Sequence, residues 1–116
     1  MSLEKAKKHY QGKAGSDKMN CGQAVIAAFR EKFLVGDEDV KIFAGYGSGK
    51  APEGVCGAYY AAKFMLEGKH KDKIRACEEM FLLNAGSVKC KEIRALKKLP
   101  CLGCVEKIAE FLETIE

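Results

Sequence analysis

The apolar residues of this chain recur every three or four positions almost throughout, which is the spacing of one face of an α-helix. No stretch alternates apolar and polar residues for long enough to demand a β-strand. The pattern therefore predicts an all-α fold, a compact bundle of about six or seven short helices. The chain has 116 residues and shows neither a linker nor an internal repeat. We therefore expect one cysteine-rich helical domain over residues 1–116.

Residues that commonly start or end helices separate the expected segments. Asn20 and Ser87 are predicted N-caps, and Pro100 is expected to start the last helix. Gly36 and Gly86 are expected to end the helices before them. The predicted helical segments are a short one with Leu3, Ala6 and Tyr10 on one face, and then residues 21–34, 37–47, 54–68, 71–86, 87–98 and 101–116, with a loop over residues 48–53.

The charge of the chain is mild and changes the picture little. Lys and Arg number 20 and Asp and Glu number 16, so the net charge is +4. The basic clusters lie beside apolar positions in helix-like sequence, which is typical of a solvated helix face. A nucleic-acid surface needs a clustered basic face and a recognisable motif, so we expect no nucleic-acid partner.

The apolar segments are also too short for a membrane. No run approaches the roughly 18 apolar residues of a membrane span, so we expect no membrane insertion. The first residues, "MSLEKAKKHYQGKAG", are charged from the fourth position and contain no apolar signal region. These features predict a cytoplasmic protein.

Cysteine is the unusual component of the composition. A reducing cytoplasm disfavours stable structural disulfides, so a cytosolic chain rich in cysteine more often uses its thiols for metal binding or redox chemistry. Cys77 is expected in the middle of a helix on its apolar face, and we interpret it as a core residue. The six cysteines are Cys21, Cys56, Cys77, Cys90, Cys101 and Cys104.

Four of the cysteines are expected at the N-termini of helices, namely Cys21, Cys56, Cys90 and Cys101. The unpaired backbone N–H groups and the positive end of the helix dipole stabilise a thiolate there and lower the pKa of a cysteine. Cys56 is flanked by glycines, which allow backbone or a partner sulfur to approach closely. We therefore expect Cys56 to have a lowered pKa and to act as the reactive thiolate or as a metal ligand.

The segment "CLGC" places Cys101 and Cys104 three residues apart on one face of the last helix. A Cys-x-x-Cys pair at a helix N-terminus is the arrangement that tunes thiols in disulfide oxidoreductases. The strand that precedes this motif in thioredoxin-like folds is not expected here. The pair is therefore a candidate for redox chemistry in a different fold.

The order of four cysteines and a glycine-rich loop resembles the C_GCAxxG_C_C family, whose members are classed as redox-active. "NCGQAV" is similar to the first cysteine segment of the family and holds Cys21. "GYGSGKAPEGVCGA" is similar to the glycine-rich loop and the Cys-Gly-Ala motif, with Cys56. "VKCKEI" holds the third cysteine, Cys90, and "PCLGCVEKIAEFLE" holds the fourth, Cys101.

The resemblance runs over most of the chain, with three departures. Ala61 stands where the family motif has a glycine, and Cys77 and Cys104 are additional cysteines. Cys104 could serve this chain as a resolving thiol. The resemblance implies redox activity through cysteines, and it implies a functional link to a transporter, because members are often encoded near transporter genes.

The leading hypothesis is thiol–disulfide or electron-transfer chemistry, which makes the chain a candidate thiol–disulfide oxidoreductase. One thiolate would attack a disulfide of a redox partner protein or of a small molecule, and a neighbouring thiol would resolve the mixed disulfide. We predict Cys56 as the attacking residue and Cys101 with Cys104 as the resolving or second active pair. Cys21 and Cys90 would take part if the helix ends converge.

Two alternatives remain open at this point. Cys21, Cys56, Cys90 and Cys101 could together bind zinc or an iron–sulfur cluster, although only Cys101 and Cys104 have the tight spacing common in such sites. The chain could instead be a small helical interaction module with buried structural cysteines. No cofactor is required by the leading hypothesis.

Overall fold

The computed structural model describes residues 2–11, 20–43, 45 and 54–115. Within these residues the fold is all-α, as the apolar spacing predicts, and it contains seven α-helices and one short 3-10 turn. The predicted loop over residues 48–53 lies outside the described part of the chain. The helices are α1 (Ser2–Gln11), α2 (Cys21–Phe29), α3 (Asp37–Phe43), α4 (Gly57–Leu66), α5 (Ile74–Ala85, preceded by the turn η2 over Lys71–Lys73), α6 (Cys90–Leu96) and α7 (Cys101–Glu113).

Several helix boundaries follow directly from the local sequence. The Asn20 side chain accepts a hydrogen bond from the backbone N–H of Gln23 at 2.8 Å, which confirms Asn20 as the N-cap of α2. Gly86 ends α5 with φ of 86°, a conformation that glycine adopts without strain. Gly36 precedes α3, which begins at Asp37 as predicted.

Ser87 is not the N-cap of α6, so that prediction is wrong. The helix begins three residues later, at Cys90, and its N-cap is Lys89. The Ser87 hydroxyl instead accepts a hydrogen bond from the backbone N–H of Lys89 at 3.0 Å and donates one to Glu92 at 2.7 Å. Its side chain thus forms a local turn before the helix, the competing role that serine often takes.

The segment predicted as helix over residues 21–34 is shorter in the structure. The helix α2 ends at Phe29, and the backbone N–H of Val35 bonds to the carbonyl of Arg30 at 2.8 Å. Leu34 has a positive φ of 56°, which no α-helix can continue through. The chain therefore turns before Gly36 and not at it.

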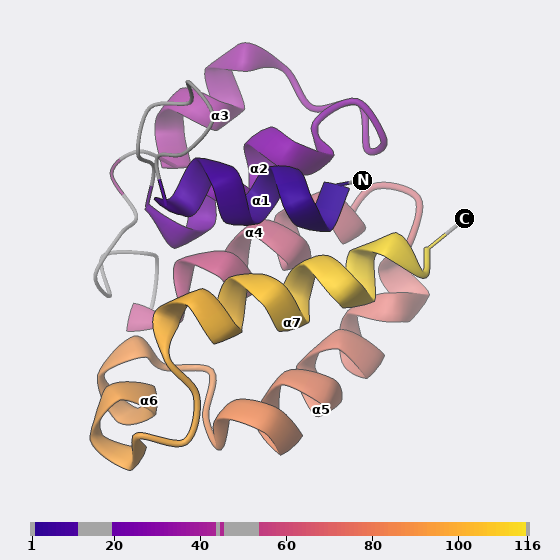
Figure 1. Ribbon diagram of the computed structural model, residues 1–116. Helices are drawn as coiled ribbons and strands as arrows, with labels where there is room; N and C mark the ends of the chain where they lie inside the picture. The colour runs from indigo at the N-terminus through magenta and orange to yellow at the C-terminus, as the bar shows by residue number, and fades with distance from the viewer. Residues whose placement is uncertain (1, 12–19, 44, 46–53, 116) are drawn as a thin grey trace.

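The helices pack around α2, α4 and α7. In Figure 1, α1 runs antiparallel to α7 and lies beside it, with α2 and α4 behind and α5 and α6 below. One contiguous hydrophobic cluster includes side chains from all seven helices. Cys77 belongs to this cluster and is 1% exposed, which confirms its prediction as a core residue. In the described part of the chain, no helix is both long enough and apolar enough to cross a bilayer.

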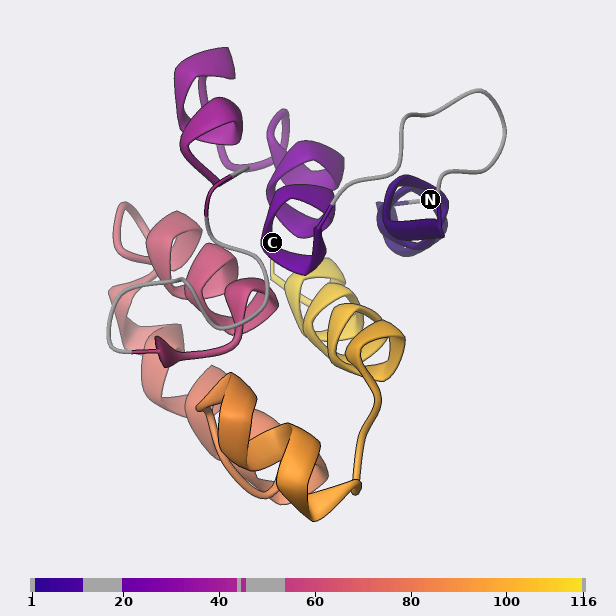
Figure 2. The ribbon, with the colours of Figure 1, turned by 90° about the vertical axis from the view of Figure 1, so that its left-hand side faces the viewer.

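The antiparallel arrangement brings several helix ends to one side of the molecule. The last turn of α1 lies beside the first turn of α7, and α6 lies next to that end (Figure 1). Figure 2 looks onto this side, with α2, α4, α6 and the start of α7 around it. The N-termini of four helices therefore meet in one region of the fold.

Candidate functional site

Five of the six cysteines line one pocket of about 330 Å³. They are Cys21, Cys56, Cys90, Cys101 and Cys104. The remaining wall is apolar apart from two cationic side chains, and it consists of Ile93, Arg94, Lys97, Leu99 and Pro100. The volume is at the lower end of the range for small-molecule pockets.

The cysteines reach this pocket because four of them start helices that converge there. Cys21, Cys90 and Cys101 are the first residues of α2, α6 and α7, and Cys56 is the N-cap of α4. This confirms the predicted placement at helix N-termini. Cys104 comes from the next turn of α7, so it lies deeper along the same helix.

Two glycines allow the starts of α2 and α4 to touch. A Cβ atom on Gly22 would lie 2.8 Å from the carbonyl oxygen and 3.2 Å from the Cα atom of Gly57. Real Cβ atoms do not approach backbone so closely, so the contact requires glycine at Gly22. Because each glycine directly follows a cysteine, this contact also brings Cys21 and Cys56 together.

A short backbone connection holds the start of α4 to the start of α6. Val55 and Lys89 form an isolated antiparallel bridge, and the backbone N–H of Cys56 donates to the carbonyl of Val88 at 2.6 Å. Gly54 precedes this bridge with a positive φ of 72°. The bridge fixes Cys56 in the same wall of the pocket as Cys90.

Three buried thiols interact with one another. Cys21 interacts with Cys56, and Cys56 interacts with Cys104. All three are buried, with exposed fractions of 9%, 4% and 2%. The hydrogen bond to Cys56, followed by burial, raises the pKa of Cys21 strongly. The hydrogen bond to Cys104, with burial, raises the pKa of Cys56 to about 12.

The expected lowering of the Cys56 pKa is therefore wrong. The hydrogen bond with Cys21 and the backbone N–H of Tyr59, in the first turn of α4, do make a contribution that lowers the pKa of Cys56. The hydrogen bond with Cys104 and the loss of solvent outweigh that contribution, because both favour the neutral thiol. Cys56 is a proton-bearing thiol in the interior of the cluster and is not exposed at its surface.

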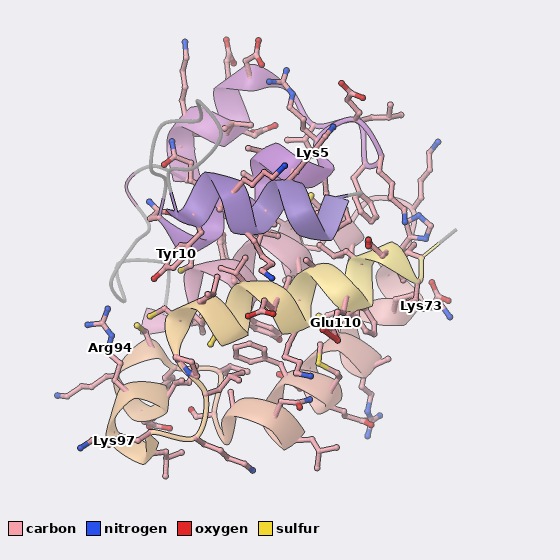
Figure 3. The ribbon with its side chains drawn as sticks, viewed as in Figure 1. Lys5, Tyr10, Lys73, Arg94, Lys97 and Glu110 are labelled. Atoms are coloured by element: carbon pink, nitrogen blue, oxygen red, sulfur yellow. The ribbon has the colours of Figure 1, made fainter. Side chains whose placement is uncertain are left out.

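Cys101 has a different environment from the other cysteines. It is the one half-buried cysteine in the described part of the chain, since the other five are buried. The side chains of Tyr10 and Arg94 both interact with its sulfur. Burial, together with the charge and hydrogen bond of Cys101, raises the pKa of Tyr10 to about 12, so Tyr10 keeps its proton for this contact. Figure 3 shows Tyr10 and Arg94 on the same side of the molecule, at the end of α1 and on α6.

Cys90 is the neighbour of this group on α6. Burial raises its pKa, and the positive charge of Arg94, one helical turn away, opposes the rise. Attraction to Cys90 is in turn the main reason that the pKa of Arg94 is raised. Arg94 therefore faces two sulfurs, those of Cys90 and Cys101.

The metal alternative finds no support in the side-chain arrangement. Among the described residues, no three Cys, His, Asp or Glu side chains are placed to hold a metal ion. Cys56 is engaged with Cys21 and Cys104, while Cys101 is engaged with Tyr10 and Arg94. The donor set Cys21, Cys56, Cys90 and Cys101 thus lines one pocket without forming a coordination shell.

A comparison with protein-family models matches residues 19–115 to the family described as "Putative redox-active protein (C_GCAxxG_C_C)". The match covers most of the chain and all six cysteines. The chain belongs to this family. No curated protein and no solved structure matches the chain.

Two of the three departures of this C_GCAxxG_C_C protein from the family motif, Ala61 and Cys104, can now be placed beside Cys77, which lies in the core. Ala61, which stands in place of the motif glycine, is fully buried in α4, where its methyl group belongs to the hydrophobic core. The additional Cys104 lies at the centre of the cluster, next to Cys56. The extra thiol is therefore part of the pocket and not an unrelated core residue.

Three residues of the site escaped the sequence reasoning. Tyr10 was expected only as an apolar position of the first helix, and Arg94 only as part of a basic helix face. For Gly22 the sequence does contain an indication, because Cys21-Gly22 repeats the Cys-Gly pair of Cys56-Gly57. Contacts between helices that are distant in sequence bring all three to the pocket.

Proposed function

We propose that this chain is a thiol–disulfide oxidoreductase in which Cys101 is the attacking thiol and Cys104 the resolving thiol. The observation that carries the proposal is the asymmetry of the pair. Cys101 is half-exposed at the pocket and contacts Tyr10 and Arg94, while Cys104 is 2% exposed one turn deeper. An attacking thiol must meet its substrate, whereas a resolving thiol only needs to reach its neighbour.

The reaction has two balanced steps. The Cys101 thiolate attacks one sulfur of a substrate disulfide, forms a mixed disulfide and releases the other substrate sulfur as a thiolate that takes up a proton. The Cys104 thiol then loses its proton and attacks the sulfur of Cys101. This step releases the second substrate thiol, so the substrate gains two electrons and Cys101–Cys104 becomes the disulfide.

Arg94 and Tyr10 support the first step. Both side chains interact with the Cys101 sulfur, and donors and cations beside a cysteine favour the thiolate that attacks a disulfide. Arg94 and Lys97 are the two cationic side chains that line the pocket, so both can meet an entering substrate. Ile93, Leu99 and Pro100 form an apolar wall beside the reacting sulfurs.

The substrate class follows from the size of the pocket. A volume of about 330 Å³ admits one half of a small disulfide or a single disulfide-bearing loop of a partner protein. An external thiol must reduce the Cys101–Cys104 disulfide before the protein can react again, and a reducing compartment such as the cytoplasm would provide one. A redox partner protein and a small thiol both fit this requirement.

The proposal is tested by trapping the mixed disulfide. Reduced full-length protein is mixed with a small aromatic disulfide, 5,5′-dithiobis(2-nitrobenzoate), and the adduct is located by peptide mass spectrometry. Cys104→Ser should accumulate an adduct on Cys101, because the resolving thiol is missing. The wild type should instead release two thionitrobenzoate ions and contain a Cys101–Cys104 disulfide.

Two controls make the outcome specific. Cys101→Ser should lose the rapid reaction, while Cys90→Ser should keep it, although Cys90 lines the same pocket. An adduct found first on Cys56 or Cys21 would contradict the assignment of Cys101. Six thiols that all react only after denaturation would instead support the interpretation of buried structural cysteines.

A further inference from the structure

The proposed reaction leaves the buried pair Cys21 and Cys56 without a role. Both line the pocket, yet both are almost inaccessible to a substrate. They also lie beside the active pair, because Cys21, Cys56, Cys101 and Cys104 line the same pocket and Cys56 interacts with both Cys21 and Cys104. The four sulfurs therefore form a continuous path from the mouth of the pocket into the interior.

We propose that this path is a disulfide relay, in which the disulfide formed at Cys101–Cys104 moves inward to Cys21–Cys56. The inference rests on the proposed function, because it begins with the disulfide that substrate reduction leaves behind. Cys104 is the exchange point, since it has Cys101 three residues before it on α7 and Cys56 across the helix interface. The result is a buried second dithiol that reduces the first.

The relay consists of two isomerisations that need no outside oxidant or reductant. In the first, the Cys56 thiol loses its proton and attacks Cys104, so that a Cys56–Cys104 disulfide forms and Cys101 leaves as a thiolate. In the second, the Cys21 thiol loses its proton and attacks Cys56, so that a Cys21–Cys56 disulfide forms and Cys104 leaves. Each leaving sulfur takes up one proton, so electrons and protons balance within the chain.

The backbone geometry favours the final pairing of Cys21 with Cys56. Gly22 and Gly57 are in direct backbone contact, because a Cβ at Gly22 would lie only 2.8 Å from the Gly57 carbonyl oxygen. The residues before them are therefore already held side by side. A disulfide needs its two Cα atoms roughly 4.4–6.8 Å apart, and it forms without strain only where the backbones are already this close.

The charge distribution sets the direction of the relay. Arg94 and Lys97 line the pocket together with Cys101, and cationic side chains beside a cysteine favour its reduced form. Among the described residues, two thiols, burial and the backbone N–H of Tyr59 shift the pKa of Cys56, and no cation does. A dithiol whose reduced form is stabilised is the stronger oxidant, so the disulfide should pass from Cys101–Cys104 to Cys21–Cys56.

The consequence is a larger redox capacity. When the inner pair accepts the disulfide, Cys101 and Cys104 return to thiols and can reduce a second substrate. One chain then delivers four electrons before it needs an external thiol. A chain with one working dithiol delivers two.

The test is a time course on reduced full-length wild type with one equivalent of 5,5′-dithiobis(2-nitrobenzoate). Samples are quenched with acid, their free thiols are labelled with N-ethylmaleimide, and disulfides are mapped by mass spectrometry. We expect Cys101–Cys104 first and Cys21–Cys56 later, with a second equivalent restoring Cys101–Cys104. After the second equivalent has reacted, the total release should be four thionitrobenzoate ions per chain.

A persistent Cys101–Cys104 disulfide, with Cys21 and Cys56 still labelled as thiols, would overturn the relay and leave the oxidoreductase proposal intact. Failure to form Cys101–Cys104 at all would overturn both. The two failures are therefore distinguishable in the same experiment, which needs no substitution that could disturb folding.

Variants test the route. Cys56→Ser should stop at Cys101–Cys104 and release two ions in place of four, and Cys104→Ser should leave Cys21 and Cys56 as thiols. Cys77→Ala is the matched control, because Cys77 is a buried free cysteine that does not line the pocket, and it should release four. Formation of Cys21–Cys56 in Cys104→Ser would contradict the relay, since the probe would then be reaching the inner pair directly.

Discussion

Gly22 and Gly57 are in backbone contact at the point where α2 and α4 begin. The Cα hydrogen of Gly22 occupies the place where a Cβ would meet the Gly57 carbonyl oxygen at 2.8 Å and its carbon at 3.0 Å. Because Cys21 and Cys56 immediately precede these glycines, the contact determines how closely their thiols approach. The absence of one side chain thus assembles the inner half of the cysteine cluster.

Replacing Gly22 with alanine should separate the two helix starts. The new methyl group meets backbone that cannot rotate away, so we expect a loss of about 1–3 kcal/mol in the free energy of unfolding. The Cys21–Cys56 hydrogen bond should weaken as the helices move apart. Urea denaturation of the reduced protein measures the first effect, and the yield of the Cys21–Cys56 disulfide measures the second.

Gly68→Ala is the matched control for this substitution. A Cβ on Gly68 would meet nothing within 4 Å, and its φ is not positive. The control should change stability by less than about 0.5 kcal/mol, as is usual for surface positions. If both variants lose the same free energy of unfolding, the close contact at Gly22 is not the cause of the destabilisation.

Arg94 should control the reactivity of Cys101. In Arg94→Ala the cation that interacts with the Cys101 sulfur is gone, so negative charge there is less well held. Arg94 is exposed, which limits its effect, and we expect alkylation of Cys101 by iodoacetamide at pH 7 to slow by about two- to fivefold. Lys91→Ala removes a charge from the same helix away from the pocket and should leave the rate unchanged. A rate that falls equally in both variants would indicate a general charge effect.

The reduced protein should lose stability above pH 9. Burial raises the pKa of Cys77 from 9.0 to about 12, and the hydrogen bond to Cys104 does the same for Cys56. Both thiols ionise in the unfolded chain before they ionise in the folded one. The unfolded state therefore binds fewer protons between pH 9 and pH 12, and the free energy of unfolding falls as the pH rises in that window.

Cys77 permits a clean measurement of this effect, because it lies outside the pocket. Each such thiol contributes a slope of up to about 1.4 kcal/mol per pH unit. Urea denaturation at pH 8, 9 and 10 with a phosphine reductant should give a shallower slope for Cys77→Ala than for the wild type. Identical slopes would show that the Cys77 thiol is not held neutral by the fold.

Protein purified without oxygen and without chelator should contain less than one zinc or iron per chain. Metal binding requires thiolates, and Cys56 holds its proton to about pH 12 while it is hydrogen-bonded to Cys104. Elemental analysis checks this directly. About one metal per chain, lost in a Cys56→Ser and Cys101→Ser double variant, would instead support the coordination site that the sequence left open.

The sequence by itself determined the helices and which cysteines lie at their N-termini. Apolar spacing, the Asn20 cap and the glycines at helix ends depend on neighbouring residues, so they can be found in a linear pattern. The same locality explains why Cys21, Cys56, Cys90 and Cys101 were correctly expected at helix N-termini. The prediction of Ser87 as an N-cap failed because serine can form either a cap or a turn with the same side chain.

The tertiary structure alone decided which cysteine is exposed, which are buried and what each one contacts. The expected low pKa of Cys56 depended on a local helix dipole, and it was reversed by Cys104, a residue 48 positions later in the numbering. Tyr10 and Arg94 reach Cys101 only because α1 and α6 pack beside the start of α7. Burial and hydrogen bonds between distant segments set the proton affinity of a thiol, and neither can be read from the order of residues along the chain.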